Sequence, residues 1–282
     1  MKTILVPTDF SRYAGYATEL AAEIALKIGA ELSFIHVLDI SKSGTSDYYM
    51  NYQVVQQMTH EAETRLKELQ TRYGGMIETN TFLVTCPPNE SVINAISSIN
   101  ADLIIMGSEG NNDLQSILLG SHTEKVVRNT NCPVLSIREP VQVRDFREAL
   151  VAFDPETFSE NYIWEIKGLH KLLDINFTFL YVKPFNSPYS HNELSLFLDT
   201  YFSRVGLSYR LKVVESSFVE DCIVEESKKS HADLIVLNTH SRKGISRLLR
   251  GSTAENIINT TLTPTLVLHL QKTDQQFLYE IA

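Results

Sequence analysis

The sequence has little of several features that would narrow its function at once. Three of its 282 residues are cysteines, and they show no paired spacing: Cys86, Cys132 and Cys222. This favours three separate thiols over a disulfide or a metal site. No apolar run approaches the roughly 20 residues that cross a bilayer, and Asp9 ends the opening apolar stretch too early for a signal peptide. We therefore expect a cytoplasmic protein with no membrane partner.

Positive charge and familiar catalytic motifs are also scarce. The chain has 25 Lys and Arg against 34 Asp and Glu, a formal net charge of −9. This argues against nucleic acid as a partner, because phosphate backbones select basic surfaces. The sequence contains no Walker-type loop, dinucleotide GxGxxG, nucleophile-elbow GxSxG or zinc-ligand spacing. Neither His122 nor His240 has a paired carboxylate beside it, so we assign no catalytic residue and no metal ligand.

What the sequence does contain is an internal repeat. The stretch ADLIIMGSEG at 101–110 returns as ADLIVLNTHS at 232–241, and ILVPTDFS at 4–11 resembles LVAFDPET at 150–157. The two copies are too far apart for a solenoid, whose units are shorter, so the repeat indicates two duplicated domains.

We expect these domains at residues 1–140 and 145–282. Each alternates apolar strand patterns with helical ones, which is typical of a parallel sheet covered by helices on both faces. The strands expected in the first domain are 2–8, 31–40, 78–84, 101–107 and 133–138. Those expected in the second are 150–153, 176–182, 209–214, 234–237 and 265–270. The helices expected in the first domain are 11–28, 54–72, 90–99 and 123–129, with 41–53 as a mobile loop.

The segment MGSEGNNDLQSILLGSHTE at 106–124 follows the fourth expected strand and leads into a helix. Ligands of open parallel sheets bind beyond the carboxyl ends of the strands. Gly107, Gly110 and Gly120 allow the backbone to pass close to a ligand. The helix that follows offers free N–H groups and a positive dipole end, which suit an anion. The alternative is an ordinary turn with a capping box in which Ser121 is the N-cap, a pattern that returns in the second copy with Ser252 as the N-cap.

Asp9 strengthens the prediction of a ligand site. It ends the first expected strand, which neighbours the fourth in the usual doubly wound order. A carboxylate at this place can accept hydrogen bonds from a ribose or from an adenine amino group. The alternative is that Asp9 caps the following helix, and the two roles can coexist.

The spacing Gly107-x2-Gly110-x9-Gly120-Ser121 resembles the ATP-binding motif of the universal stress protein family. The segments ILVPTDFS, IHV and NCPVLSIR are also similar to that family, and the resemblance covers nearly the whole chain. It implies two tandem doubly wound α/β domains, each with a five-stranded parallel sheet of the adenine nucleotide alpha-hydrolase-like type. It also implies a pseudo-two-fold pair joined through the fifth strands, for which PVLSIR and PTLVLHL are the candidates.

The resemblance further implies an adenine nucleotide site in the first domain. The residues that would contact the adenosine, with Val37 against the base, are Pro7, Thr8, Asp9, Val37, Met106 and Gly107. The residues that would hold the phosphates are Gly110, Gly120, Ser121 and His122. The expected ligand is ATP, ADP or AMP, with Mg²⁺ as an optional companion.

The second copy departs from this motif. Asn238 stands in the place of Gly107, Ser241 in that of Gly110, and Phe153 replaces Thr8, where its ring could fill the adenosine site. Its loop is also basic, which would attract phosphates, but exposed charges contribute only about 0–1 kcal/mol per pair. The alternative for these charges is a solvated face or an ion-paired domain contact. We therefore predict the nucleotide site in the first domain and a structural remnant in the second.

Three functions follow from these patterns. The first is a stress-response regulator in which the nucleotide orders segment 41–53 and changes a surface for an unknown protein partner. The second is an interaction scaffold of the same fold that binds no nucleotide. The third is an enzyme, either a slow ATPase or one that acts on an adenylated substrate. A homodimer is left open by the sequence.

Overall fold

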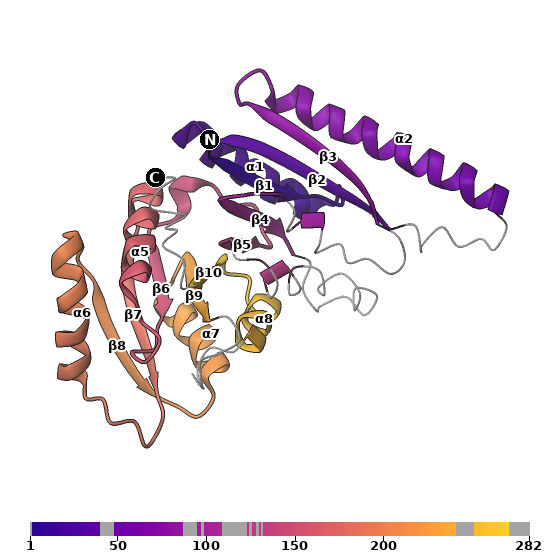
Figure 1. The fold of residues 1–282 in the computed structure, drawn as a ribbon. Helices are drawn as coiled ribbons and strands as arrows, with labels where there is room; N and C mark the ends of the chain where they lie inside the picture. The colour runs from indigo at the N-terminus through magenta and orange to yellow at the C-terminus, as the bar shows by residue number, and fades with distance from the viewer. Residues whose placement is uncertain are drawn as a thin grey trace.

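The computed structural model describes residues 2–39, 48–86, 95–96, 99–108, 123, 126–127, 130, 132–240 and 251–270. Within these residues, ten strands form one continuous sheet in the order β3-β2-β1-β4-β5-β10-β9-β6-β7-β8 (Figure 1). Neighbouring strands are parallel except at the centre, where β5 and β10 run antiparallel. The order of the first half is mirrored in the second, so the predicted pair of tandem doubly wound domains is confirmed.

The strands follow the apolar runs of the sequence. Those of the first half are β1 (Thr3–Pro7), β2 (Glu31–Asp39), β3 (Thr79–Cys86), β4 (Leu103–Gly107) and β5 (Val134–Ile137). Those of the second half are β6 (Glu148–Ala152), β7 (Asn176–Lys183), β8 (Arg210–Glu215), β9 (Leu234–His240) and β10 (Thr265–Leu270). Central strands such as β5 are buried along their whole length, as expected of strands in the middle of a parallel sheet.

The helices connect the strands by crossovers. They are α1 (Arg12–Ile28), α2 (Tyr48–Tyr73), α5 (Glu160–Leu173), α6 (His191–Val205), α7 (Val219–Lys229) and α8 (Gly251–Thr260), with a short 3₁₀ helix η2 (Val143–Asp145) between the domains. Because such crossovers are right-handed, α5 and α6 lie on one face of the second half and α7 and α8 on the other. Across the described residues, none of these helices combines the length and apolarity that a bilayer crossing needs.

Helix α1 begins and ends where the sequence predicts. The Oγ atom of Ser11 accepts a hydrogen bond from the N–H of Ala14 at 3.3 Å, and Gly29 ends the helix in the left-handed conformation with φ 65°. Both are favoured terminal residues, since Ser satisfies a free N–H group and Gly tolerates positive φ.

Helix α2 begins earlier than predicted. The expected loop at 41–53 is wrong for 48–53, which form the start of the helix. The physical reason is that no Gly or Pro stands between 48 and 53 to end the helical backbone. Residues 41–47 lie outside the described residues. So do most of the helices expected at 90–99 and 123–129, of which 95–96, 123 and 126–127 are helical.

The two halves meet at β5 and β10. Leu135 lies opposite Leu266 in the antiparallel register, which confirms the pairing predicted for PVLSIR and PTLVLHL. Just beyond β5, Arg138 donates from Nη1 to the carbonyl oxygens of Asn259 at 3.1 Å and Thr261 at 3.0 Å. These carbonyls end α8, so a cation of the first half stabilises the negative end of a helix in the second. Burial lowers the pKa of the Arg138 guanidinium, which nevertheless stays charged.

Candidate functional site

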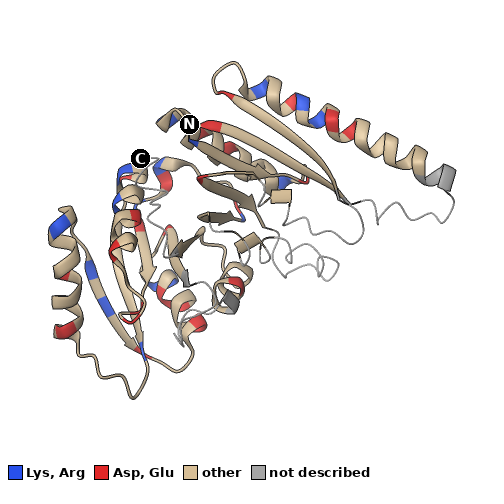
Figure 2. Ribbon diagram, in the orientation of Figure 1, with Lys and Arg blue, Asp and Glu red and all other residues tan. Residues whose placement is uncertain are grey.

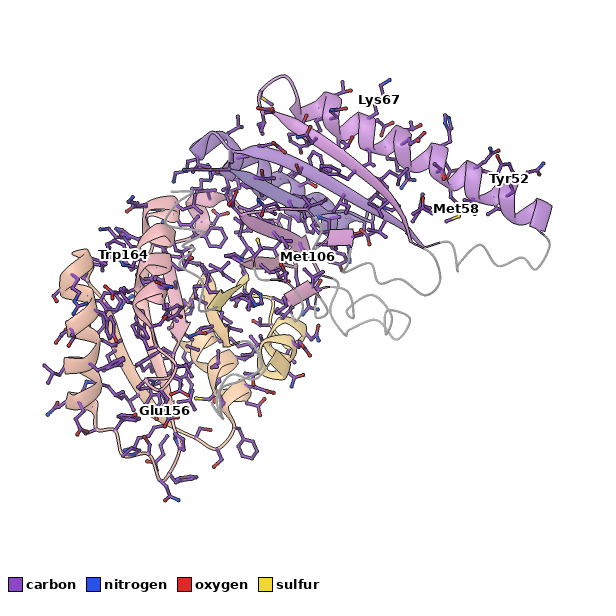
Figure 3. All side chains as sticks on the ribbon, in the orientation of Figure 1. Tyr52, Met58, Lys67, Met106, Glu156 and Trp164 are labelled. Atoms are coloured by element: carbon purple, nitrogen blue, oxygen red, sulfur yellow. The ribbon has the colours of Figure 1, made fainter. Side chains whose placement is uncertain are left out.

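The candidate adenosine residues come from three adjacent strands. Strand β1 lies between β2 and β4, and Pro7 at its end is level with Ile35. Leu5 of β1 pairs with Ile104 of β4. Two residues further along both strands, Pro7 therefore lies level with Met106. Val37 lies two residues beyond Ile35 on β2. The structure therefore brings these predicted residues to one carboxyl edge of the sheet, near Met106 as labelled in Figure 3.

Asp9 is exposed and is held by the turn that follows β1. Its Oδ1 atom accepts a hydrogen bond from the backbone N–H of Ser11 at 2.9 Å. Ser11 is the N-cap of α1, so the alternative that Asp9 itself caps the helix is wrong. Asp9 instead positions the residue that does so. Among the described residues, none donates to its Oδ2 atom, which leaves that oxygen directed to solvent or to a ligand.

Thr8 is buried and anchors the start of this turn. Its N–H donates to the carbonyl of Ile35 at 2.8 Å, and its Oγ1 accepts from the N–H of Phe10 at 3.0 Å. Its carbonyl oxygen accepts from Nδ1 of His36 at 2.7 Å. Since a carbonyl only accepts, Nδ1 of His36 carries the proton in this contact. These three bonds fix the backbone from which Asp9 projects.

Phe10 is a site residue that the sequence reasoning missed. Its backbone is left-handed, with φ 62°, which is uncommon for a bulky residue and costs of order 1–3 kcal/mol. Its ring stacks on His36, with centroids 4.6 Å apart, and the Arg65 guanidinium carbon of α2 is 5.4 Å from the same centroid. Phe10 and His36 both belong to motifs quoted from the sequence, but their contact could not be read from those motifs.

Gly107 has a structural reason to be glycine. A Cβ atom at this position would lie 2.2 Å from the carbonyl carbon and oxygen of Tyr13 and 2.7 Å from the nitrogen of Ala14. The first turn of α1 therefore packs directly on the end of β4. The structure shows that Gly107 lets a helix approach, and its predicted role of letting a ligand approach stays a prediction.

The loop that begins after Gly107 starts from a fixed point. The N–H of Ser108 donates to the carbonyl of Ile137 at 2.9 Å, and its buried Oγ accepts from Oγ of Ser136 at 3.1 Å. The four predicted phosphate residues lie outside the described residues: Gly110, Gly120, Ser121 and His122. Their roles stay predictions.

The corresponding edge of the second domain is closed. Asp154 takes the place of Asp9 and its Oδ1 accepts from the N–H of Glu156 at 3.0 Å, but the residue is only 4% exposed. The buried ring of Phe153 lies 5.6 Å from that of Phe179 and 5.9 Å from that of Tyr181, between centroids. The domain's own aromatic core therefore holds this ring and surrounds the strand end.

Asn238, in the place of Gly107, is 1% exposed, and neither its Oδ1 nor its Nδ2 has a hydrogen-bond partner among the described residues. Helix α8 begins at Gly251, so Ser252 is its second residue and the expectation that it is the N-cap is wrong.

Tyr162 of α5 is fully buried, and burial raises the pKa of its hydroxyl. Ser241 and the basic residues of this loop lie outside the described part of the chain.

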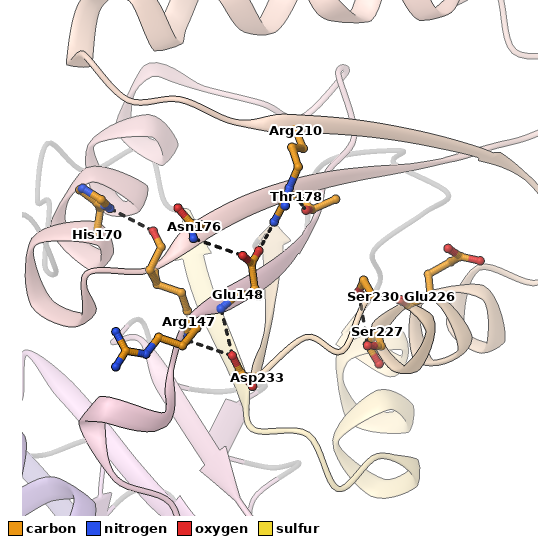
Figure 4. Close-up of polar contacts among 11 residues, drawn as sticks. Arg147, Glu148, His170, Asn176, Thr178, Arg210, Glu226, Ser227, Ser230 and Asp233 are labelled. Carbon is orange, nitrogen blue, oxygen red and sulfur yellow. Dashed lines mark hydrogen bonds and ion pairs between the residues drawn. The ribbon is translucent and has the colours of Figure 1, made fainter.

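A polar cluster also lies at the opposite, amino edge of the second domain (Figure 4). Glu148 pairs with Arg210 and accepts from Nδ2 of Asn176 at 3.2 Å. Oδ2 of Asp233 accepts from the N–H groups of Arg147 at 2.9 Å and Glu148 at 3.0 Å. These groups satisfy one another, so the cluster serves to tie the strand starts together.

The fold and the strand-end site define a tandem α/β protein with its candidate ligand site in the first half. The model of the universal stress protein family matches residues 1–138 and 146–269, and the chain belongs to this family. A universal stress protein of Methanocaldococcus jannaschii is 33% identical over 143 residues, which are 49% of this chain and 83% of that protein.

A solved structure supports the fold over nearly the whole chain. The crystal structure of a universal stress protein from Archaeoglobus fulgidus superposes with a TM-score of 0.74 at 23% identity, covering 95% of this chain and 98% of that one. A further universal stress protein was solved in complex with cAMP; it is 22% identical and covers 49% of this chain and 96% of its own, with a TM-score of 0.35.

Proposed function

We propose that the chain is a stress-response protein whose first domain, residues 1–140, binds ATP or another adenine nucleotide and acts as a nucleotide-dependent regulator. The observation that carries this proposal is the exposed Asp9 carboxylate, held at the end of β1 by the Thr8 anchor and by the bond to Ser11. A ribose or adenine donor that reaches Oδ2 forms a charge-assisted hydrogen bond, which is stronger than a neutral one.

The surroundings of Asp9 suit a nucleoside. Pro7 and Val37 are half-buried at the same edge, so they offer apolar surface for a base beside the carboxylate. Residues 145–282, the second domain in this proposal, are unsuited because Asp154 is buried. The phosphates would lie on the loop after β4, against the N-terminus of the helix expected at 123–129.

The direct test is calorimetric titration of the full chain with ATP, ADP and AMP. In Asp9→Asn an oxygen remains for the Ser11 N–H while the charge is lost. We expect nucleotide binding to weaken about tenfold or more, the usual difference between hydrogen bonds to charged and to neutral groups. The matched control is Glu156→Gln, which removes an exposed carboxylate from the equivalent turn of the second domain (Figure 3) and should bind like the wild type.

Two outcomes would contradict the proposal. Absence of binding to the wild type at about 1 mM nucleotide would leave the scaffold of the same fold as the better function. Equal affinity of Asp9→Asn and wild type would place any bound nucleotide away from the carboxyl edge of β1.

A further inference from the structure

The two outer edges of the ten-stranded sheet are chemically different. Among the described residues, β3 and β8 each pair with a strand on one side only. Strand β8 reads RLKVVE, with Arg210, Lys212 and Glu215, whereas β3 reads TNTFLVTC and has no charged residue. Figure 2 shows this contrast along the two strands. Charged side chains, Lys above all, protect free sheet edges from pairing with other chains, so among the described residues β8 has this protection and β3 does not.

Strand β3 presents backbone groups at its outer side. The carbonyl of Glu78 accepts from the N–H of Leu32 at 2.9 Å, so it faces β2. By alternation, the N–H and C=O groups of Thr79, Thr81 and Leu83 face away from β2. Nε2 of Gln70 donates to the carbonyl of Thr79 at 3.3 Å. No other side chain of the described residues bonds to this outer row, which leaves Thr81 and Leu83 for a further strand.

The first half of α2 extends this uncharged surface. The helix has 26 residues and β3 has 8, about 39 Å against about 27 Å, so the start of α2 continues past the end of β3 (Figure 1). Residues 48–59 contain no charged side chain, unlike 60–73. Tyr52 is 59% exposed, and an open hollow follows the helix from Tyr52 through Val55 and Thr59 and continues to Glu63.

Together, β3 and residues 48–59 form what we term the uncharged edge. Tyrosine and methionine with few charges are characteristic of the centres of protein interfaces, and Tyr52 and Met58 both lie on this part of α2 (Figure 3). The edge therefore combines a row of backbone groups that another strand can pair with and a neighbouring helix surface that carries no charge.

The charge of the chain indicates which partner fits. Each copy has a net charge of −9, so two copies repel each other least when they meet through surfaces that carry no charge. In an antiparallel pair across a two-fold axis, β3 lies opposite itself, and its side chains meet no like charge. The same arrangement of β8 would take the charged side chains of Arg210, Lys212 and Glu215 out of water. The chain already contains one antiparallel pairing of this kind, between β5 and β10.

We propose that the uncharged edge is a self-association surface, through which β3 pairs antiparallel with β3 of a second copy and continues the sheet across a two-fold axis. This surface is separate from the carboxyl-edge site and does not depend on nucleotide.

The test is the mass of the full chain in solution by light scattering and sedimentation equilibrium, at about 100 µM, well above a Kd on the order of 1 µM. The wild type should be a dimer. Phe82, 37% exposed near the middle of β3, is replaced in Phe82→Lys and Phe82→Glu. The outward backbone groups pair Thr81 of one copy with Leu83 of the other, so position 82 lies opposite itself. Each variant alone should therefore be monomeric because two like charges meet, and an equimolar mixture should recover the dimer because opposite charges meet.

The matched control is Leu196→Lys on α6, which changes another exposed apolar residue, 71% exposed, at the far end of the molecule. It should remain dimeric, and circular dichroism should show the wild-type fold in all variants. A monomeric wild type at this concentration overturns the proposal. So does a dimer that survives Phe82→Lys, or a mixture of the two variants that stays monomeric.

Discussion

The two domains share a topology and differ in what lies under their first helix. The buried residues of helix α1 are mostly small: Ala14, Ala17, Thr18, Ala21, Ala22 and Ala25, with Leu20 and Ile24 as the larger ones. Those of helix α5 are mostly large: Tyr162, Ile163, Glu165, Ile166, Leu169, Leu172 and Leu173, with Gly168 as the small one. The small residues of α1 allow its backbone to touch Gly107. In the second domain, Asn238 stands at the strand position that corresponds to Gly107. Side-chain size at the helix–sheet contact therefore separates an open strand end from a filled one.

The second domain, whose strand end is closed, has additional aromatic packing. Phe158 has ring contacts to Tyr162, Phe179, Phe197 and Tyr201, with centroids 5.0–6.3 Å apart. Aromatic pairs of this kind contribute about 0.5–1.5 kcal/mol each beyond the area they bury. The same half carries a buried amide at Asn238 without a described partner, so its core is apolar and strong except at the position where the other half has glycine.

The largest expected effect comes from removing the ring that fills the second strand end. Phe153→Ala should lower the free energy of unfolding of the second domain by about 3–5 kcal/mol, the usual loss for a buried Phe. Urea unfolding followed by the fluorescence of Trp164, the one tryptophan in the chain, reports this domain.

The matched change in the first domain is Thr8→Ala, which removes one hydrogen bond to Phe10 and should lower its stability by only about 1 kcal/mol. Equal losses for the two substitutions would show that the two strand ends are packed alike, against the contrast drawn from their burial.

The contact between α1 and Gly107 gives the next largest effect. Gly107→Ala forces a methyl group against the Tyr13 backbone and should destabilise the first domain by about 1–3 kcal/mol. Hydrogen exchange of the α1 amides measures it. Gly15→Ala is the control, because a Cβ there meets nothing within 4 Å, and it should stabilise α1 by up to about 1 kcal/mol. If both variants behave alike, the close approach of helix and strand is not what requires glycine.

The smallest expected effect concerns the buried amide of the second domain. Asn238→Leu replaces an amide that has no described partner by an apolar side chain of similar size. It should raise the unfolding free energy of the second domain by about 1–2 kcal/mol, measured through Trp164. Asn238→Asp should lower it, because it buries a charge. Loss of stability in Asn238→Leu would instead mean that a group outside the described residues satisfies the amide.

The sequence was sufficient to predict the order of strands and helices, the duplication and the pairing of the fifth strands. The elements follow from periodicity and from terminal residues such as Ser11 and Gly29, which act within one element, and the duplication follows from the internal repeat. The pairing of the fifth strands was implied by the family resemblance. Three features of the site could not be predicted in this way: the left-handed Phe10, its contact with Arg65 and the true neighbour of Gly107. Each depends on where another helix lies, which a local pattern does not contain.

The predicted start of α2 and the predicted N-cap role of Ser252 were wrong for a related reason. Uncharged polar residues at 48–53 and a Ser-x-x-Glu pattern at 252–255 favour loops and caps as strongly as helix interiors. Packing of the rest of each helix decides the boundary. The phosphate half of the candidate site stays a prediction from the glycine spacing.

The pairing of β5 with β10 affects how the strand ends of the two domains can change by mutation. In a homodimer, one substitution alters both sites and the partners separate on dilution. Here the halves belong to one chain, so they meet at an effective concentration set by the short connection from Ile137 to Glu148, independent of the amount of protein. Each half is also specified separately, which allows glycine at 107 and asparagine at 238. The single chain is therefore an asymmetric pair of domains, which dilution does not separate.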